Sequence, residues 1–575
     1  MKYIRFNILS YKALKDAKVK LDREPIPYIG LNESGKSSNM EAIARFDYRN
    51  DQIASARSWK FLNRYMPLEN EFAVEAEIEY TDEEIAAFFF SLSDAKKAEI
   101  EEKLLNETKI TLTRHFIKDG ANEIIIYSMF GLRDAEMQTI CQKIIQSLPR
   151  IIYFDNFLEN PFPDKVQFTQ AIIDGTSAPT SEPQINIINM FAAANIQISR
   201  FFAETESTVR DTLLTDVNRQ LSTRIITDWK RMHVGKQELD VGANNLSVEL
   251  VLSRETELTF EIRILETFKD AEKVERTIPM NLSERSQGFR WFFNFSVKKC
   301  YSSLDEGKFV YLIDEPGSYL HTSAQEVLLK AIVDLAKTNW VIFTTHSEFL
   351  LDPEIININN IKVVEKHERV IKIKPLAETR VSKKLGTLSP LYNALRMKAP
   401  IDTTINKNVI VTEGITDFYF WRMLIDGVVF LPGFGADNNQ YLISLAIGTA
   451  KNYVALFDGD DEGNKAISQY TKFFGSEQAN YWLKYKTSTG NEVVLETLFS
   501  PTDQQRLLTL TEVKDLKKAI TLLFFAKDKQ KEFWEGIDQE TKNNISATLI
   551  AIKDTLNVKG EVQFRYSFAD ISPKG

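Results

Sequence analysis

Apolar and polar residues alternate in several stretches of the N-terminal part of the chain, at 4–9, 17–21, 71–80, 109–116 and 123–127. A period of two is typical of strands that turn one face to a core. The last two stretches flank Asp119 and Gly120, so we expect a hairpin there. The pattern therefore predicts a sheet, and the apolar spacing after Lys36 predicts a helix beside it.

The pattern changes further along the chain. Residues 167–231 are polar with helix-compatible spacing, which predicts a helical insertion, and alternation returns at 246–265. Short apolar runs then occur at 309–313, 340–344, 408–412 and 453–457. Runs of this length are typical of buried strands, and each is followed by polar residues.

The residues GLNESGKS, at 30–37, match the phosphate-loop pattern. Glycines let backbone N–H groups close around the β-phosphate, Lys36 reaches the β- and γ-oxygens, and the Ser37 hydroxyl ligates magnesium. The apolar step before the loop and the helical spacing after it supply the strand, loop and helix that this motif requires. The pattern is anchored by Gly30, and the predicted ATP contacts are Asn32, Gly35, Lys36, Ser37 and Ser38.

Two apolar runs end in groups that suit nucleotide hydrolysis. The run 309–313 leads into Asp314, placed to hold magnesium, and Glu315, placed to polarise the attacking water. The run 340–344 precedes His346, whose imidazole we expect at the γ-phosphate. A helix cap would explain Asp314 alone, and a lone histidine is more often structural. Two strands that both end in polar residues favour a site.

A second acidic set lies near the C-terminus. The run 408–412 ends at Glu413, and the run 453–457 ends at Asp458 and Asp460. Two strands separated by a helix predict a parallel sheet with three carboxylates at one edge. Oxygen-only ligands suit Mg²⁺ or Mn²⁺. A third strand is predicted at 492–495, followed by Glu496.

The order of motifs resembles ABC-type ATPase heads, through LSERSQG at 282–288, DEPGSYLH at 314–321 and TTHS at 344–347. With the C-terminal acidic set, the chain resembles the OLD (overcoming lysogenization defect) family of nucleases. In such heads the serine of the LS motif, here Ser283, touches the γ-phosphate held by the opposite subunit, which implies at least a dimer. This chain departs from the transporter form of the motif, because Glu284 and Arg285 replace two glycines.

The acidic set resembles the Toprim fold that OLD nucleases share with topoisomerases and primases. By that resemblance Glu413 is a metal ligand or general base, and Asp458 and Asp460 are metal ligands. Asp417 is implied as an outer or second-metal ligand, and Glu496 as a further acidic position. A basic residue is expected to neutralise the scissile phosphate. The implied residue is Lys527, with Lys518 as its competitor.

The resulting fold class is α/β, with an ABC-type ATPase head of mixed sheet, a helical dimerisation insertion and a Toprim domain. The expected segments are the N-terminal part of the ATPase with the phosphate loop at 1–160, the insertion at 161–239, the C-terminal part of the ATPase at 240–375, a connector at 376–406 and the Toprim nuclease domain at 407–575.

The function implied by the resemblance is an ATP-binding DNA endonuclease that requires Mg²⁺ or Mn²⁺ and acts in defence against phage. Its implied partners are DNA, further copies of itself in a dimer or tetramer, and a helicase or a retron reverse transcriptase with its msDNA. The sequence leaves open whether ATP permits or restrains cleavage.

The main alternative is a non-cleaving repair or chromosome-maintenance ATPase of the RecF or SMC-head kind. Such heads give no reason for carboxylates at successive strand ends. A topoisomerase would need a different ATPase fold, and a primase would usually need zinc-binding cysteines.

Composition narrows these expectations further. The chain has 575 residues and a net charge of −9, so contacts with DNA must come from local basic surface and from metals. Its two cysteines, Cys141 and Cys300, do not form a disulfide framework or a zinc site. The absence of a long apolar run and of a signal-peptide pattern predicts a cytoplasmic protein without a membrane segment.

Overall fold

The computed structural model of the chain has two compact units. The first comprises residues 1–350 and 360–374, and the second comprises residues 351–359 and 375–575. The residues that the structure describes are 1–51, 71–89, 93–104, 107–119, 122–154, 163–174, 176–177, 181–227, 229, 245–253, 258–270, 272–301, 309–367, 369–376, 404, 406–433, 435, 439–557 and 563–564.

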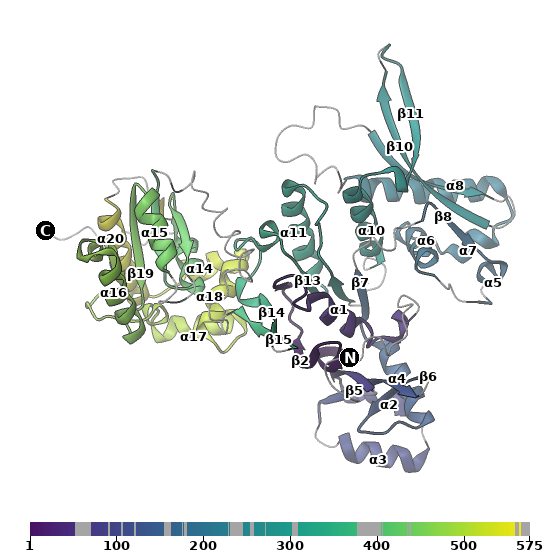
Figure 1. Ribbon diagram of the computed structural model, residues 1–575, viewed down its shortest axis with the longest axis horizontal. Helices are drawn as coiled ribbons and strands as arrows, with labels where there is room; N and C mark the ends of the chain where they lie inside the picture. The colour runs from purple at the N-terminus through teal and green to yellow at the C-terminus, as the bar shows by residue number, and fades with distance from the viewer. Residues whose placement is uncertain are drawn as a thin grey trace. The chain divides into compact units, whose positions relative to one another are not determined.

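The first unit is built on an 11-stranded mixed sheet in the order β6-β5-β4-β1-β2-β15-β14-β3-β13-β12-β7 (Figure 1). Its strands are β1 (Lys2–Tyr11), β2 (Leu14–Lys20), β3 (Ile26–Ile29), β4 (Glu71–Glu79), β5 (Lys109–Asp119), β6 (Asn122–Met129), β7 (Arg150–Phe154), β12 (Phe309–Ile313), β13 (Trp340–Thr344), β14 (Lys362–His367) and β15 (Val370–Pro375).

Neighbouring strands are antiparallel in one half of this sheet and parallel in the other. In one half β1 is antiparallel to β2 and β4, and β5 is antiparallel to β4 and β6. The expected hairpin is present, with Asp119 opposite Asn122, although its turn at 120–121 lies outside the described residues. In the other half β14, β3, β13, β12 and β7 are parallel. The segments at the carboxyl ends of these parallel strands therefore meet at one edge of the sheet.

Helices cover this sheet and lie at its edges. They are α1 (Lys36–Ala44), α2 (Asp82–Phe89), α3 (Asp94–Leu104), α4 (Ala135–Ser147), α10 (Gln287–Tyr301) and α11 (Thr322–Ala336), with the short helices η1 (Tyr48–Asn50), η4 (Leu282–Glu284) and η5 (Glu348–Leu351). A further short helix, η6 (Ile358–Asn360), lies where the chain returns from the second unit to the first. The inward-facing residues of β1, among them Phe6 and Ile8, share one apolar core with Met40 and Ile43 of α1. This core fixes the helix that begins at the end of the phosphate loop.

A smaller antiparallel sheet interrupts the sequence of the first unit. It contains β8 (Lys165–Phe168), β9 (Asn245–Ser253), β10 (Leu258–Lys269) and β11 (Glu275–Asn281). Figure 1 shows the β10–β11 pair extending past the neighbouring helices. Those helices are α5 (Gln170–Ile173), α6 (Glu182–Ala193), α7 (Ile198–Ala203), α8 (Ser207–Leu221) and the π-helical η3 (Ser222–Ile226).

The helical insertion expected at 161–239 contains near its start a strand, β8, that the sequence did not indicate. Val166 and Phe168 are buried, and β8 pairs with β10. Four residues of alternation are too short to stand out in the sequence, but an existing strand edge stabilises them.

The second unit has a four-stranded parallel sheet in the order β18-β16-β19-β20. Its strands are β16 (Asn408–Thr412), β18 (Val429–Pro432), β19 (Asn452–Phe457) and β20 (Trp482–Lys484), and a separate pair is formed by β17 (Ile425–Asp426) and β21 (Gln563–Phe564). The helices are α14 (Ile415–Leu424), α15 (Gln440–Thr449), α16 (Asp461–Phe474), η10 (Ser476–Tyr481), η11 (Leu495–Leu498), α17 (Pro501–Thr511), α18 (Leu516–Phe525), α19 (Lys527–Glu535) and α20 (Gln539–Leu556).

The third strand expected at 492–495 is wrong. Glu492 forms a single isolated bridge with Lys486, and the chain then enters η11, which contains Glu496. The strand beside β19 is β20 instead, because Trp482 packs into the core between the sheet and α16. Most of the expected connector at 376–406 lies outside the described residues. None of the described helices is long and apolar enough to cross a membrane.

One buried carboxylate ties the end of α1 to the edge strand β7. Asp47 is fully buried, binds the guanidinium of Arg49 and accepts a hydrogen bond from the backbone N–H of Ile151 at 3.2 Å. Asn50 adds hydrogen bonds to the carbonyls of Ala44 and Ile151, both at 3.0 Å. These contacts hold the phosphate-loop helix against the parallel half of the sheet.

We expect Asp47→Ala to lower the unfolding free energy of the first unit by about 3 kcal/mol, because Arg49 and the Ile151 N–H lose their partner in a buried setting. The measurement is urea unfolding followed by hydrogen exchange in peptides covering 36–51 and 150–154. Asp334→Ala is the control, because Asp334 forms only an exposed ion pair with Lys337, and its effect should stay below about 0.5 kcal/mol. Equal effects of the two variants would contradict the anchoring role of Asp47.

Candidate functional sites

The phosphate loop joins β3 to α1, and two of its glycines are required by close packing. A Cβ atom on Gly30 would lie 2.4 Å from the carbonyl oxygen of Val364. Gly35 has a φ of 102°, and a Cβ atom there would lie 2.1 Å from Cδ1 of Ile371. Left-handed backbone and missing side chains let the loop curl tightly in front of α1. Asn32 is exposed on the loop, and Ser37 and Ser38 are half-buried in the first turn of α1.

The Lys36 ammonium lies inside this loop rather than in solvent. Its side chain is 6% exposed, and Nζ donates to the carbonyls of Gly30 at 3.1 Å and Leu31 at 3.3 Å. Nζ also lies 2.7 Å from Nε2 of His346 and 3.9 Å from Oε1 of Glu315. Burial lowers the pKa of Lys36, while Glu315 and Asp314 oppose that change. The structure therefore brings together the lysine, acids and histidine that the sequence placed in one nucleotide site.

Asp314 and Glu315 come directly after β12 and are held by Thr344, the first residue of the TTHS motif, for which the sequence suggested no role. The hydroxyl of Thr344, at the end of β13, donates to Oδ1 of Asp314 at 2.5 Å and accepts from the Glu315 N–H at 2.8 Å. Thr344 is fully buried. Its signal in the sequence was its position at the end of a buried run, but nothing local showed which way its hydroxyl points. Ser37 also hydrogen-bonds with Asp314, which joins the two predicted magnesium ligands.

The electrostatics of these acids reflect their burial. Burial raises the pKa of Asp314, against hydrogen bonds from Thr344 and Ser37 that lower it. Burial also raises the pKa of Glu315 to about 7, while Lys36 lowers it and Asp314 raises it. Burial and then the charge of Lys36 lower the pKa of His346. Glu315 has a φ of 46°, an uncommon conformation for a non-glycine residue that tends to occur at functional sites.

The LS motif lies in η4 and is engaged within the first unit. The backbone N–H of Ser283 donates to Oδ1 of Asp164 at 2.9 Å, and its hydroxyl donates to Oδ2 of the same residue at 2.5 Å. Arg285 pairs with Glu266 at 3.1 Å and lies over the Phe289 ring. The described contacts of Arg285 are thus with residues of the first unit.

In the second unit, adjacent parallel strands deliver Glu413 and Asp458 to the same edge. Glu413 comes directly after β16, Asp458 comes directly after β19, and Oε2 of Glu413 accepts from the Asp458 N–H at 2.9 Å. Oδ1 of Asp458 accepts from the Leu495 N–H at 2.9 Å. Asp460 caps α16 by accepting from the Gly463 N–H, also at 2.9 Å. Each carboxylate thus has one oxygen fixed by backbone, and its other oxygen accepts no hydrogen bond within the described part of the chain.

Close backbone approach explains the glycines around this edge. A Cβ atom on Gly459 would lie 2.5 Å from the backbone nitrogen of Val493, and one on Gly463 would lie 2.2 Å from the carbonyl oxygen of Asp458. A Cβ atom on Gly433 would likewise lie too close to the carbonyl oxygens of Thr412 and Glu413. A side chain at any of these three glycines would therefore collide with neighbouring backbone atoms.

Asp417 lies in the first turn of α14 and is oriented by an aromatic network. The Tyr485 hydroxyl donates to Oδ1 of Asp417 at 2.5 Å, and Nε1 of Trp421 donates to the Tyr485 oxygen at 3.2 Å. All three residues are buried. Tyr485 comes directly after β20 and was not identified from the sequence, because no motif links a tyrosine there to an aspartate on a helix 68 residues earlier.

Lys517, which the sequence did not indicate, contacts an acid of this set, and the role expected of Lys527 stays a prediction. Lys517 Nζ lies 3.5 Å from Oε1 of Glu496. Lys527 instead lies over the Phe524 ring, 4.2 Å from its centroid. Lys518 contributes its backbone N–H to the Asp515 cap of α18 while its side chain is exposed. Helix α18 starts at Leu516, and this start determines which lysine lies beside Glu496. The spacing of lysines in the sequence does not show where the helix starts.

These carboxylates influence one another strongly. Burial raises the pKa of Glu413 to about 7, and Asp458 and Asp460 add to the increase. Burial and neighbouring acids also raise the pKa of Asp417 and of Asp458. The pKa of Lys517 is raised, because Glu496, Asp458 and Asp417 together outweigh the effect of burial. The site concentrates negative charge around a single neighbouring ammonium.

An excess of buried carboxylate oxygens suits a hard divalent cation. Among the residues that the structure describes, no three His, Cys, Asp or Glu side chains already converge as a finished metal site. Glu413 and Asp458 each have one oxygen that accepts a hydrogen bond from a backbone N–H. The donor chemistry fits Mg²⁺ or Mn²⁺, with Glu413, Asp458 and Asp460 as the residues that would hold it and Asp417 and Glu496 beside them.

Residues 1–351 of the chain match the family model described as an AAA ATPase domain. Uncharacterized protein MJECL43 of Methanocaldococcus jannaschii is 28% identical over 134 residues, which are 23% of this chain and 33% of that protein. The chain thus spans about a third of the length of that relative. The first unit therefore contains an ATP-binding ATPase domain.

Three solved structures of SMC heads are similar to part of this chain. The Smc head bound to the C-winged helix domain of ScpA has a TM-score of 0.39 at 12% identity, over 65% of this chain and 98% of that chain. The SMC head domain from Thermotoga maritima has a TM-score of 0.33 at 14% identity, over 65% and 99%. The ScpA-bound head with an extended coiled coil from Pyrococcus furiosus has a TM-score of 0.39 at 13% identity, over 69% and 99%.

We expect Thr344→Val to slow ATP hydrolysis about tenfold while changing ATP affinity less than about threefold, because the Glu315 N–H and Asp314 lose a buried partner. Phosphate release and titration with a fluorescent nucleotide measure the two quantities. Thr345→Val is the matched control, since the Thr345 hydroxyl accepts only from the Ser347 N–H in the described contacts. A normal hydrolysis rate in Thr344→Val would refute the bridging role.

We expect Tyr485→Phe to weaken Mn²⁺ binding about tenfold, because the residue that orients a candidate ligand loses its hydroxyl. Electron paramagnetic resonance of free Mn²⁺ measures the affinity without any substrate. Tyr453→Phe is the matched control, because the Tyr453 hydroxyl donates to Gln478 at 2.7 Å instead of to an acid. Unchanged Mn²⁺ affinity in Tyr485→Phe would show that the network is structural only.

Proposed function

This chain belongs to the AAA ATPase domain family, and we propose that its ATPase governs a metal-dependent DNA endonuclease site in the second unit. The observation that carries the proposal is the direct contact of Glu413 with Asp458 across two neighbouring parallel strands. Asp417, Asp460, Glu496 and Lys517 surround that pair, as their mutual electrostatic effects indicate. The resemblance to Toprim nucleases supplies the reaction class.

The residues of the second unit divide the work by their placement. Bound Mg²⁺ or Mn²⁺ supplies Lewis-acid activation of water and stabilises the leaving oxygen of a phosphodiester. Glu413 and Asp458 would each offer one oxygen to that ion, because the other oxygen accepts a hydrogen bond from a backbone N–H. Lys517 lies at the rim of the carboxylates, with its side chain 62% exposed, and is placed to neutralise a scissile phosphate.

The residues of the first unit bind and hydrolyse the nucleotide. Lys36 is held inside the loop by carbonyl oxygens and exchanges these partners for phosphate oxygens when ATP binds. Asp314 and Ser37 are already joined and hold magnesium together. Glu315, 3.3 Å from His346, is placed to orient water. Ser283 of a second copy completes the site, and this arrangement makes assembly depend on ATP.

Plasmid cleavage in Mn²⁺ tests this function. We expect wild-type protein to nick or cut supercoiled DNA and Asp458→Asn to lose at least about 100-fold in rate, because the substitution removes a charged ligand and keeps the acceptor for the Leu495 N–H. Asp461→Asn, an exposed neighbour on α16, should retain full rate. Lys36→Ala should abolish the effect of ATP on cleavage while leaving the metal dependence unchanged.

The outcomes separate the two candidate functions. Cleavage that persists in Asp458→Asn contradicts the nuclease site. Absence of cleavage in every metal and nucleotide condition, with ATP hydrolysis intact, favours a non-cleaving ATPase. The sign of the ATP effect in wild-type protein shows whether nucleotide permits or restrains the cut.

A further inference from the structure

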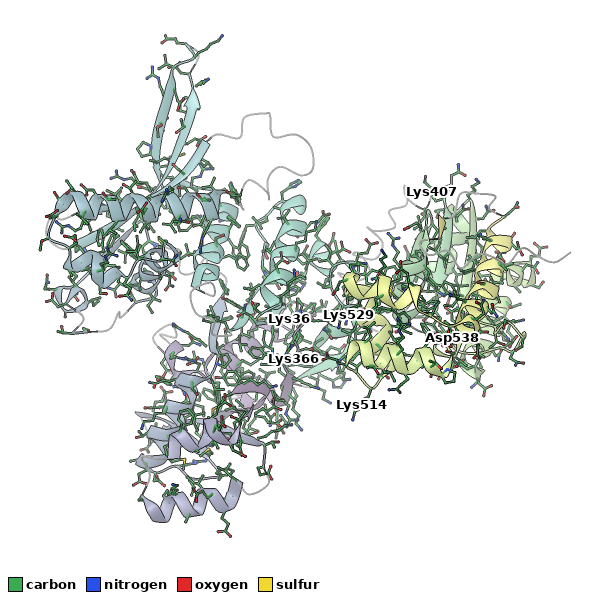
Figure 2. The ribbon with its side chains drawn as sticks, turned by 180° about the vertical axis from the view of Figure 1, so that it is seen from behind. Lys36, Lys366, Lys407, Lys514, Lys529 and Asp538 are labelled. Atoms are coloured by element: carbon green, nitrogen blue, oxygen red, sulfur yellow. The ribbon has the colours of Figure 1, made fainter. Side chains whose placement is uncertain are left out.

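The start of α18 carries a group of lysines in a chain whose net charge is −9. Lys514 precedes the helix cap, and Lys517 and Lys518 lie in the first turn of α18. All three are exposed, and Lys514 extends outward from the helical layer in Figure 2. We name these three residues the α18 lysine group.

Lys517 fixes the location of this group relative to the candidate metal site. Its ammonium lies 3.5 Å from Oε1 of Glu496, and it also interacts with Asp458 and Asp417. The first turn of α18 therefore borders the carboxylates. Lys514 and Lys518 lie three residues before and one residue after Lys517 in the sequence.

Lys514 and Lys518 form no ion pair within the described part of the chain. Other lysines of the same unit do pair with acids, as Lys484 does with Glu492 at 2.8 Å. Lys529 is also engaged, because its ammonium donates to the Leu510 carbonyl at the end of α17. The charge of the α18 lysine group is therefore compensated only at Lys517.

The position of these lysines is unfavourable for the helix itself. The N-terminus of a helix carries partial positive charge, so cations in the first turn destabilise it and acids stabilise it. The first turn of α18 contains no acid, and Asp515 at the cap is the nearest compensation. An external anion at this position would offset the cost, and the adjoining carboxylates are the proposed site of phosphodiester chemistry.

We propose that Lys514, Lys517 and Lys518 bind the sugar-phosphate backbone of duplex DNA and lead it to the carboxylates of the second unit. This inference rests on the proposed function, since DNA is the substrate of that site. Lysine ammoniums are compact charges that contact phosphates without reading base edges, so the binding is independent of sequence and falls steeply with salt. The α18 lysine group is thus the positive surface that the net charge of the chain does not provide.

The experiment compares wild-type protein with Lys514→Glu/Lys518→Glu, leaving Lys517 intact at the acidic site. Affinity for a short fluorescein-labelled DNA duplex is measured by anisotropy in EDTA, over a series of KCl concentrations. We expect a loss of at least about tenfold, and a salt slope reduced by about 0.9 for each lost phosphate contact. We also expect a higher melting temperature for this variant, because acids replace cations at a helix N-terminus.

Lys465→Glu/Lys472→Glu is the matched control. These exposed lysines lie on α16 of the same unit, and the substitution changes the net charge by the same amount. Lys472 lies in the last turn of its helix, where a cation is favourable, so this control should melt at a lower temperature while binding DNA almost normally.

Equal loss of affinity in both double variants would reduce the effect to net charge and overturn the proposal. Unchanged affinity of Lys514→Glu/Lys518→Glu for the DNA duplex would also overturn it. So would a loss of affinity for an RNA duplex without a loss for the DNA duplex. Normal DNA binding by wild-type protein without plasmid cleavage would contradict the nuclease and leave this surface standing, because anisotropy in EDTA requires no metal and no cut.

Discussion

Both candidate sites depend on one constraint of backbone geometry, which is that the carboxyl ends of neighbouring parallel strands lie at the same edge of a sheet. In the first unit β3, β13 and β12 are neighbours, so the phosphate loop, His346 and the pair Asp314–Glu315 meet although hundreds of residues separate them in sequence. In the second unit β16 and β19 bring Glu413 against Asp458 in the same way. The chemistry of each site is therefore a consequence of strand direction before it is a consequence of side chains.

Burial makes the charges at these edges costly, and the two sites balance that cost differently. Lys36 is compensated on several sides, by the carbonyls of Gly30 and Leu31 and by Glu315. The second site has acids in excess, with Lys517 as a partner at the rim, and the raised pKa values of Glu413 and its neighbours express the mutual repulsion. The charges of the nucleotide site are therefore balanced without a nucleotide. In the second site a bound cation would offset the repulsion between the acids.

Features that depend on short-range patterns could be predicted from the sequence. Features that depend on contacts between distant segments could not. The alternation around Asp119, the phosphate loop and the acids at strand ends can be inferred from local periodicity and motif spacing. Thr344 and Tyr485 were missed, because each acts on a residue of another element through a hydroxyl whose direction no pattern reveals. Lys527 and Lys518 were considered and Lys517 was not, because spacing does not say where a helix starts. The short strand β8 exists only because β10 offers it an edge.

The chain crosses from one unit to the other three times, after residues 350, 359 and 374. Residues 351–359 belong to the second unit but lie between segments of the first, and the Tyr419 hydroxyl binds the backbone of this excursion at Ile356 and Ile358, both at 3.2 Å. Tyr419 is on α14, the helix that carries Asp417. On the other side of the excursion β14 packs its Val364 carbonyl against Gly30. The excursion therefore connects, along the chain, the strand beside the phosphate loop to a segment that packs against the helix of Asp417.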